Sequence, residues 1–496
     1  MRIVLWLSVL VAVAAYICGP VMDPDLWWHI TVGRWIVAHH TIPSSDLWNL
    51  FAAGMPWRAY SWSNEVVFAL VDSYLGDRGL LLLKFALALA LAGSLFYCLS
   101  KLSQDWFFGS LLGIFSTTAC YNHFTLRPQS LVWIFFIWLI FVSERIVQNG
   151  FSARRVATLL LIMCFWANTH ITTILGIAIC MIWLFQRNDW KRAIWGGLIC
   201  VCGTLITPYY GGEWLTFFSK TGHPFAHQAI VEFQPAHIMQ HSTGFWVIIA
   251  VFLGAVVHDR PKLLPFPMLA AAAAFSLAGL AIVKFLPIAV ILLAALVAVS
   301  WSQLEGKQAG LKNIIEAIDR LRERALSLPL EGLAFVFLCI AAVNFFPLWS
   351  HPINRAVVPV SALDFLMEKS LPFPLLNDFG RGGYVMYRLS DSKGELQHKV
   401  TIDGRTNVNP PEVWEKSQAS FRGRQNWREY IDMTKANSIL WPSESPLTAI
   451  LKATGEWCRV FESGTEDRGF SIFIKSELLE QRSDLTSDNC ERQPVV

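Results

Sequence analysis

Residues 78–100, RGLLLLKFALALALAGSLFYCLS, decide the class of fold. Apart from Arg78 and Lys84 the stretch carries no charge, and it is as long as the about 20 residues that a helix needs to cross a bilayer. Ten further apolar runs follow the same pattern, at 3–20, 106–122, 129–143, 156–171, 172–186, 193–207, 244–257, 264–281, 284–301 and 332–349. The sequence therefore predicts a mainly α, polytopic transmembrane bundle of about 11 spans.

Charge is distributed unevenly along the 496 residues. Residues 1–350 hold 22 Lys and Arg and 17 Asp and Glu, whereas the much shorter stretch 351–496 holds 18 and 20. Soluble domains carry about 25% charged residues, which only the second part matches. The net charge of +3 gives no basic field for a nucleic acid. These figures exclude a single soluble enzyme and a nucleic-acid binder, and they predict a membrane domain over 1–350.

Basic residues set the expected orientation. With the N-terminus inside, 15 of the 22 Lys and Arg of the first 350 residues fall in inner loops, among them those of an amphipathic helix expected within 302–330. An odd number of spans then places the C-terminal region outside. Arg2 and the small residues Ala12 and Ala14 would also suit a secretory signal, but we favour an uncleaved first helix. Either choice leaves the following loop, 21–77, outside.

This first external loop has an unusual composition. Its apolar positions from Leu26 to Val37 repeat at helical spacing, and six Trp occur between residues 27 and 62. Trp rings favour the headgroup level of a membrane, so the pattern predicts a helix that lies in the interface. Asp25 stands at its N-terminus, where carboxylates are favoured, and His29 follows four residues later on the same face.

Two interpretations of that face stay open. In the first, Asp25 only caps the helix and His29 makes a local hydrogen bond. In the second, Asp25 is a general base or a metal ligand at the water–membrane boundary, and His29 orients it or a substrate phosphate. Asp23 adds a second carboxylate two residues before Asp25. Asp46 and Glu65 are further acidic residues of the same loop.

Other polar residues gather on the expected outer side. Arg127 stands at a span boundary, Asn168 and His170 lie in a polar island between two apolar runs, and Lys284 lies within or beside a span. Polar groups at membrane depth are costly and tend to mark functional sites. The loop after Thr207 adds a series of acidic residues and histidines: Glu213, His223, His227, Glu232, His237 and His241.

Familiar catalytic motifs are absent from the sequence. It contains no phosphate-binding glycine loop, no serine elbow, no HExxH helix and no dinucleotide fingerprint. Because an enzyme on the outer face has no nucleotide supply, its activated substrate would have to arrive attached to a lipid.

From about residue 351 the pattern changes to short apolar runs separated by Gly, Pro and Asp. Strands are expected at 372–376, 384–387, 400–402, 438–440, 459–461 and 470–474, and helices at 361–369, 414–420, 427–434 and 446–454. This alternation predicts an external α/β domain over 351–477, followed by a polar, disordered tail over 478–496. Cys458 and Cys490 lie in this part, where a disulfide is compatible with the sequence but not required by it.

Two motifs of this region have a structural and a functional interpretation. Gly380, Gly382 and Gly383 form either a tight structural turn, which we favour, or a turn that approaches a phosphate. Asp403-Gly404-Arg405 follows an expected strand and either faces the membrane site or pairs internally.

Several blocks of the sequence resemble bacterial membrane proteins of the GT-C glycosyltransferase superfamily. In the first external loop these are Asp25-Leu26-Trp27-Trp28-His29, Gly33-Arg34-Trp35-Ile36, Ile42-Pro43, Asp46, Pro56-Trp57 and Trp62 with Glu65. Arg127-Pro128-Gln129, Trp166-Ala167-Asn168-Thr169-His170, the stretch from Asn377 to Tyr384 and Ile402-Asp403-Gly404-Arg405 resemble later blocks of one largely uncharacterised branch. The branch commonly has Asn and Arg where this sequence has Thr207 and Lys284, and Lys keeps the charge of Arg without its bidentate fork.

The resemblance implies a membrane enzyme that moves a sugar from a polyprenyl-phosphate or polyprenyl-diphosphate carrier, with inversion, to a saccharide, lipid or protein acceptor. By position it implies that Asp25 is the general base or a metal ligand, with His29 beside it and Asp23 as a less certain second acid. Arg127 and His170 would steady the leaving phosphate, and a divalent cation would be an optional cofactor. Asn168, Glu232 and Lys284 would line the site together with Asp46 and Glu65.

The implied location is the bacterial inner membrane, with the N-terminus cytoplasmic and the C-terminal domain periplasmic. Two other functions remain open: a transporter or flippase for a lipid-linked saccharide, and a non-catalytic membrane partner in envelope polysaccharide assembly. Transporters usually show internal repeats and polar groups along a path to both faces. This sequence shows no repeat, and its polar residues are one-sided, which favours the transferase.

Overall fold

The computed structural model describes residues 2–212, 214–215, 217, 231–237, 241–260, 263–304, 311–464 and 469–490. They form two compact units. One contains residues 2–19 and the described residues of 81–351, and the other contains residues 20–80 and the described residues from 352 onward. We call them the membrane unit and the outer unit, after the locations that the sequence predicts. The predicted first external loop therefore folds with the C-terminal region. Helix α3 (Trp62–Ser103) passes from the outer unit into the membrane unit, and its helical geometry is interrupted at Gly76.

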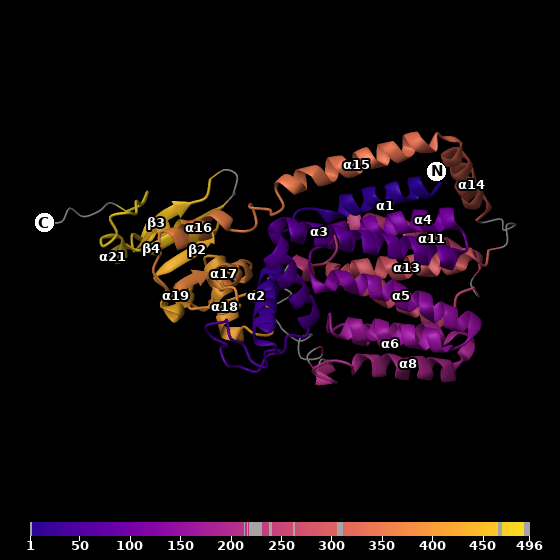
Figure 1. The fold of residues 1–496 in the computed structure, drawn as a ribbon, viewed down its shortest axis with the longest axis horizontal. Coiled ribbons are helices and arrows are strands. Elements are labelled where there is room, and N and C mark those ends of the chain that lie inside the picture. Colours follow the sequence, from indigo (N-terminus) through magenta and orange to yellow (C-terminus); the bar gives the residue numbers. More distant parts are fainter. Residues whose placement is uncertain are drawn as a thin grey trace. The chain divides into compact units, whose positions relative to one another are not determined.

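The membrane unit is a helical bundle (Figure 1). Its elements are the second part of α3, then α1 (Arg2–Cys18), α4 (Trp106–Ala119), η1 (Tyr121–His123), α5 (Pro128–Asn149), α6 (Ala153–Ala167), α7 (Thr173–Leu184), η2 (Gln186–Asn188), α8 (Trp190–Thr204), η3 (Val231–Phe233), α11 (His241–Asp259), α12 (Phe266–Ala281), η4 (Val283–Phe285), α13 (Leu286–Trp301), α14 (Lys312–Ser327) and α15 (Leu330–Ser350).

Each predicted apolar run overlaps one of these helices, which confirms the mainly helical fold. Within the described residues, five helices are long and apolar enough to cross a membrane: Trp62–Ser103, Pro128–Asn149, Ser242–Asp259, Val283–Trp301 and Leu330–Ser350. Four shorter apolar helices cover Ile3–Cys18, Trp106–Ala119, Thr173–Leu184 and Phe266–Ala281. The number of about 11 spans stays a prediction.

Helix α13 forms the centre of this unit. Its residues from Leu286 to Ser300 are buried all round, because it packs against α4, α5, α11 and α12. A helix that is apolar on every face needs such surroundings. The amphipathic helix expected within 302–330 is found as α14, and its Arg322 pairs with Asp105, the N-cap residue of α4.

The outer unit contains a four-stranded sheet in the order β1-β2-β4-β3 (Figure 1). The strands are β1 (Leu375–Asn377), β2 (Ser438–Pro442), β3 (Trp457–Glu462) and β4 (Phe470–Lys475). β1 and β2 are parallel, with Leu376 opposite Ile439, whereas β4 runs antiparallel to both β2 and β3. The helices of this unit are α2 (Pro24–His39), the first part of α3, α16 (Val360–Glu368), α17 (Gly382–Leu389), α18 (Pro411–Phe421), α19 (Arg428–Thr434), α20 (Pro446–Thr454) and α21 (Ser476–Leu479).

Two of the expected strands are absent from the sheet. The strand expected at 384–387 is wrong, because these residues belong to helix α17, which packs on α2. A four-residue apolar run fits either periodicity, so tertiary packing decides. The strand expected at 400–402 is reduced to one bridge, between Asn49 and Val400. The other four expected strands and the four expected helices are present.

The C-terminal end of the described chain is attached to the sheet. Cys458 on β3 forms a disulfide with Cys490, and Arg459 pairs with Asp488. Asp488, Asn489 and Cys490, which lie in the expected polar tail, therefore contact β3. Residues 491–496 lie outside the described residues.

Candidate functional site

Asp25 lies in the first turn of α2, but Asp23 is the residue that caps this helix. The Oδ1 atom of Asp23 accepts a hydrogen bond from the backbone N–H of Asp25 at 2.9 Å, and Pro24 occupies the first helical position. The carboxylate of Asp25 is half-buried and accepts a hydrogen bond from the indole Nε1 of Trp28 at 3.2 Å. Asp25 is thus fixed in the first turn without serving as the cap.

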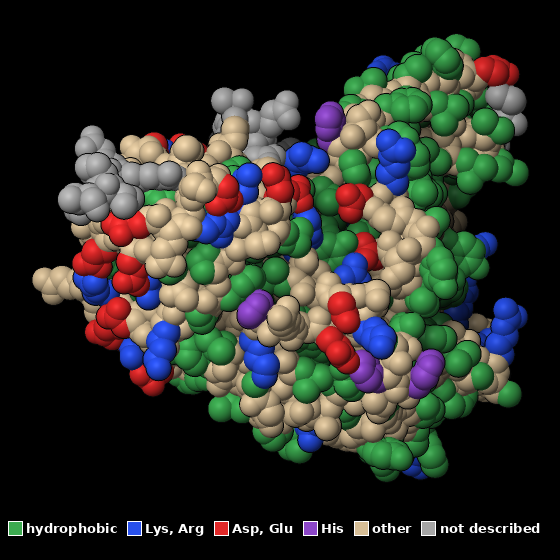
Figure 2. Space-filling view, turned by 60° about the vertical axis from the view of Figure 1, so that its left-hand side comes forward, with side chains coloured by type: hydrophobic (Ala, Val, Ile, Leu, Met, Phe, Trp, Pro, Cys, Tyr) green, Lys and Arg blue, Asp and Glu red, His purple; other side chains and the backbone are tan. Residues whose placement is uncertain are grey.

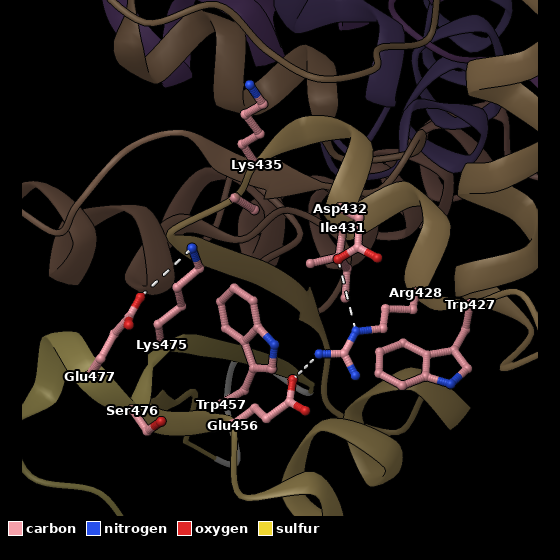
Figure 3. Close-up of a pocket in the computed structure, with 11 residues that line it drawn as sticks. Trp427, Arg428, Ile431, Asp432, Lys435, Glu456, Trp457, Lys475, Ser476 and Glu477 are labelled. Atoms are coloured by element: carbon pink, nitrogen blue, oxygen red, sulfur yellow. Dashed lines mark hydrogen bonds and ion pairs between the residues drawn. The ribbon is translucent and has the colours of Figure 1, made fainter.

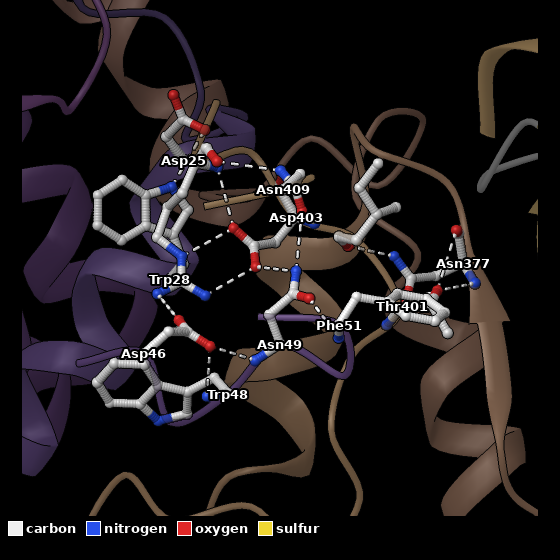
Figure 4. Close-up of polar contacts among 12 residues, drawn as sticks. Asp25, Trp28, Asp46, Trp48, Asn49, Phe51, Asn377, Thr401, Asp403 and Asn409 are labelled. Atoms are coloured by element: carbon white, nitrogen blue, oxygen red, sulfur yellow. Dashed lines mark hydrogen bonds and ion pairs between the residues drawn. The ribbon is translucent and has the colours of Figure 1, made fainter. Parts of the chain in front are cut away.

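A loop from the C-terminal region lies directly against this carboxylate (Figure 4). A Cβ atom built on Gly404 would stand 2.0 Å from Oδ1 of Asp25, a distance that no side chain can occupy. The two glycines at the start of α17 have a similar role. A Cβ atom on Gly382 would stand 1.8 Å from the carbonyl oxygen of Ile402. A Cβ atom on Gly383 would stand 2.4 Å from the carbonyl oxygen of Pro24. These glycines allow close packing around the start of α2.

The next residue, Arg405, forms a buried ionic cluster (Figure 4). Its guanidinium donates from Nε and Nη2 to the two carboxylate oxygens of Asp403, both at 2.8 Å, and its Nη1 lies 2.6 Å from Oδ2 of Asp46. Asn49 and Asn409 complete the group, with a hydrogen bond of 2.8 Å between them. We call these five residues the Arg405 cluster. Of the two interpretations of Asp403-Gly404-Arg405, it agrees with the one in which Arg405 pairs internally.

Aromatic rings surround the same guanidinium. The rings of Trp57, Trp48 and Trp28 lie 4.9, 5.5 and 5.9 Å from its central carbon. Cation–π contacts of this kind are strongest when water is excluded. Burial by itself would lower the pKa of Arg405, but the carboxylates of Asp403 and Asp46 outweigh it and raise the pKa above its usual value. Arg405 is therefore permanently charged.

His29 belongs to a second buried contact of α2. Its Nδ1 lies 3.1 Å from Oε1 of Glu65 at the start of α3, and both side chains are almost fully buried. The ring of His29 also lies against Trp28, with 3.5 Å between the ring centroids. Trp28 therefore contacts both Asp25 and His29, the two residues expected to share one face.

In the membrane unit, three of the predicted residues form a cation cluster: Arg127, Glu232 and Lys284. The Nη1 atom of Arg127 lies 2.6 Å from Oε1 of Glu232, and Nζ of Lys284 lies 3.7 Å from its Oε2. Arg127 immediately precedes α5, and Lys284 lies in η4 just before α13. Two cations thus share one carboxylate.

Charge dominates the titration of this group. Burial raises the pKa of Glu232, but Arg127, Lys284 and His123 lower it more strongly, to about 2. Burial also lowers the pKa of the neighbouring His123 imidazole. Glu232 is consequently ionised, and His123 favours its neutral form near neutral pH.

Asn168 and His170 have other contacts. The side-chain amide of Asn168 donates to the carbonyl oxygens of Cys164 and Ile206, both at 2.8 Å, which joins the end of α6 to the segment after α8. Nδ1 of His170 lies 2.9 Å from the hydroxyl of Thr172. Of the other expected residues, Glu213, His223 and His227 lie outside the described residues, and nothing is described of the side chain of His241.

Potential metal ligands are the next feature of the described residues. Among the described residues, no group of three or more His, Cys, Asp and Glu side chains is arranged to bind one. Asp23 and Asp46 are engaged as a helix cap and as a partner of Arg405. Within the described residues no such group is thus found, and a divalent cation with Asp25 as a ligand stays a prediction.

Sequence reasoning noted Asp403-Gly404-Arg405 but did not include these residues in the site. The available signal was a glycine between two opposite charges directly after a short apolar run. Asn49, Asn409 and His123 were not predicted, and each lacks a distinctive pattern in the sequence.

No protein-family model matches the chain, and no curated protein matches it by sequence. Its fold is shared with solved oligosaccharyltransferases of the archaeon Archaeoglobus fulgidus. The oligosaccharyltransferase AglB, in complex with an inhibitory peptide and a dolichol-phosphate, superposes with a TM-score of 0.58 at 10% identity, over 96% of this chain and 74% of that one.

Two further structures of an oligosaccharyltransferase from this archaeon have the same fold as this chain. The apo form gives a TM-score of 0.55 at 9% identity, over 96% of this chain and 74% of that one. The form tethered to an acceptor peptide gives 0.53 at 9% identity, over 98% and 74%. At these identities the likeness establishes a common fold with these oligosaccharyltransferases.

Proposed function

We propose that this protein is an inverting membrane glycosyltransferase that uses a polyprenyl-phosphate-type sugar donor on the extracytoplasmic face. The observation that carries the proposal is the fold shared with oligosaccharyltransferases over nearly the whole chain. One of these neighbours holds a dolichol-phosphate and another an acceptor peptide. A lipid-linked donor is thus consistent with this fold, and the acceptor is a saccharide, a lipid or a protein.

In the proposed reaction Asp25 is the general base. The oxygen of an acceptor hydroxyl attacks the anomeric carbon of the sugar while its proton passes to the carboxylate of Asp25. The bond between that carbon and the phosphate oxygen breaks, so that the phosphate leaves on its lipid and the configuration inverts once. His29, held by Glu65, keeps Trp28 and thereby Asp25 in place.

We assign the cation cluster of the membrane unit to the carrier phosphate. Arg127 and Lys284 lie together at the carboxylate of Glu232, and cations placed side by side in this way suit the oxygens of a phosphate. Asn168 and His170, at the turn between α6 and α7, are proposed to line the path of the donor. This assignment and that of Asp25 concern different units of the protein.

The sidedness is part of the proposal. We place the protein in a bacterial inner membrane, with the N-terminus cytoplasmic and both the first external loop and the region from 351 onward periplasmic. The distribution of Lys and Arg supports this orientation, and the disulfide at Cys490 is of the kind that persists in an oxidising compartment.

The decisive experiment compares Asp25→Asn with the wild-type protein in saccharide transfer. Purified full-length protein in detergent is given a polyprenyl-phosphate donor with a radiolabelled sugar and a panel of acceptors. Loss of a positioned general base should reduce the rate by about 10²–10⁴-fold. The control variant is Glu368→Gln, which changes an exposed carboxylate. Asp46→Asn is unsuitable as a control because Asp46 pairs with the buried Arg405.

The outcomes separate the candidate functions. If Asp25→Asn remains fully active, the assignment of the base is wrong. If transfer by the wild-type protein requires a divalent cation and Asp25→Asn no longer responds to that cation, Asp25 is a metal ligand, and oxygens of the substrate complete the coordination. If the wild-type protein moves a lipid-linked saccharide across a vesicle membrane without transferring its sugar, the protein is a flippase. Absence of both activities, together with no binding of the donor, refutes the transferase.

A further inference from the structure

The outer unit contains an open cleft of about 620 Å³ beside the edge strand β3 (Figure 3). The start of α19 forms one side of this cleft, and the adjacent ends of β3 and β4 form another. Its volume is typical of clefts that take a small ligand. We call it the Trp427 cleft; among its lining residues are Trp427, Arg428, Asp432, Glu456, Trp457 and Lys475.

Two indole rings and a guanidinium give the cleft its character. Trp457 is buried at the start of β3, whereas Trp427, before α19, is only half-buried. In the view of Figure 3 the side chain of Arg428 extends between these two indoles, and its central carbon lies 5.9 Å from the ring of Trp427. Half-exposed indoles combine an apolar face with a donor, which suits ligands that are partly apolar and partly polar.

The charges around the cleft cancel. Three basic residues, Arg428, Lys435 and Lys475, face three acidic ones, Asp432, Glu456 and Glu477. A net charge of zero gives no advantage to a phosphate or to another anion. In Figure 2, acidic and basic side chains also lie interspersed over the face shown rather than in patches of one sign.

The ion pairs at the rim are of a kind that a ligand can replace. Arg428 pairs with Glu456 and lies 3.9 Å from Asp432, and Lys475 lies 4.0 Å from Glu477. The side chains of Arg428 and Glu456 are 51% and 49% exposed, and ion pairs as open to water as this contribute little to stability. Hydroxyl groups can therefore take over these donors and acceptors at little cost.

We propose that the Trp427 cleft binds an uncharged saccharide. The C–H face of a sugar ring would stack on the indole of Trp427, and its hydroxyls would bond to Arg428, Asp432 and Glu456. That this saccharide is the glycan of the acceptor rests on the proposed transferase function. That the ligand is an uncharged saccharide is argued from the cleft alone. Nothing in the proposed base chemistry of Asp25 requires this cleft.

The test measures binding without turnover. Full-length protein in detergent is titrated with chitotriose, mannotriose and maltotriose in the absence of any donor, and binding is followed by saturation-transfer NMR and calorimetry. We expect at least one trisaccharide to bind, and Trp427→Ala to weaken it at least tenfold while Trp427→Phe retains most of the affinity. Trp190→Ala, which removes an exposed indole of the membrane unit, is the matched control and should leave binding unchanged.

The results of this test are independent of the base. Asp25→Asn should retain full affinity for the trisaccharide even where transfer is lost. The cleft proposal is overturned if no trisaccharide binds, if Trp427→Ala binds as tightly as wild type, or if only a peptide or an anionic probe such as inorganic phosphate competes at the cleft. Transfer that persists in these cases leaves the proposed function standing.

Discussion

Replacing Arg405 with Ala should destabilise the outer unit severely. The substitution removes the one guanidinium that compensates Asp46 and Asp403, and all three side chains are at most 1% exposed. Removing one partner of a buried pair costs about 3–5 kcal/mol, because the remaining charge stays buried. Here two carboxylates are left, together with the three Trp rings that surround the guanidinium, so the upper part of that range is expected.

The expected signal is large for a unit of this size. A domain of roughly 150–250 residues shifts its melting temperature by about 2–4 °C per kcal/mol, which gives a fall of about 6–20 °C. Differential scanning fluorimetry of the full chain in detergent measures this shift. Hydrogen–deuterium exchange of peptides covering 46–57 and 400–409 then shows whether protection is lost around the cluster. Arg424→Ala, at an exposed arginine of the same unit, should change neither quantity.

A second set of variants isolates the electrostatic part. Arg405→Lys keeps the charge but cannot form the fork to Asp403 and should recover only part of the loss. Arg405→Met combined with Asp46→Asn and Asp403→Asn removes the charges together and should be more stable than Arg405→Ala alone. A melting temperature of Arg405→Ala within about 2 °C of wild type, with unchanged exchange, would show that the cluster does not stabilise the unit.

Three other changes test other parts of the protein. Gly404→Ala places a methyl group against Asp25 and should abolish transfer with little loss of fold, whereas Gly464→Ala, which has open surroundings, should be silent in the same assay. Cys490→Ser opens a loop of 32 residues and should lower stability by about 3–4 kcal/mol in thermal unfolding. The pKa of Glu232 is lowered to about 2, so its contribution to stability is present above about pH 4.5 and fades as the pH falls towards 2. The melting temperatures of the wild type and Glu232→Gln should therefore converge on acidification. A constant difference between them from pH 7 to pH 3 would contradict this.

Local patterns predicted the elements of this fold far better than its long-range contacts. The apolar runs, the helix after Asp25 and four of the strands follow from periodicity, which depends on neighbouring residues only. The strand expected at 384–387 failed because packing against α2, through Gly382 and Gly383, selects the helix. That choice depends on residues more than 350 positions earlier in the sequence.

The candidate site shows the same limit. Arg127, Glu232 and Lys284 were singled out because polar residues are conspicuous among apolar spans, and the structure brings these three together. The partners of Arg405 could not be inferred in this way. Charged residues are ordinary in a polar region, and only the folded chain brings Asp46 beside a residue 359 positions later.

The surroundings of Asp25 favour a functional interpretation over a purely structural one. A capping role is already filled by Asp23, whose carboxylate accepts from the N–H of Asp25. The side chain of Asp25 is nevertheless held by the indole of Trp28 and enclosed by Gly404, a residue at which any side chain would displace it. A general base must be held in one orientation before its substrate arrives, and these two contacts would hold Asp25 in this way. The constraints on this carboxylate therefore suit the proposed role of Asp25 as a general base.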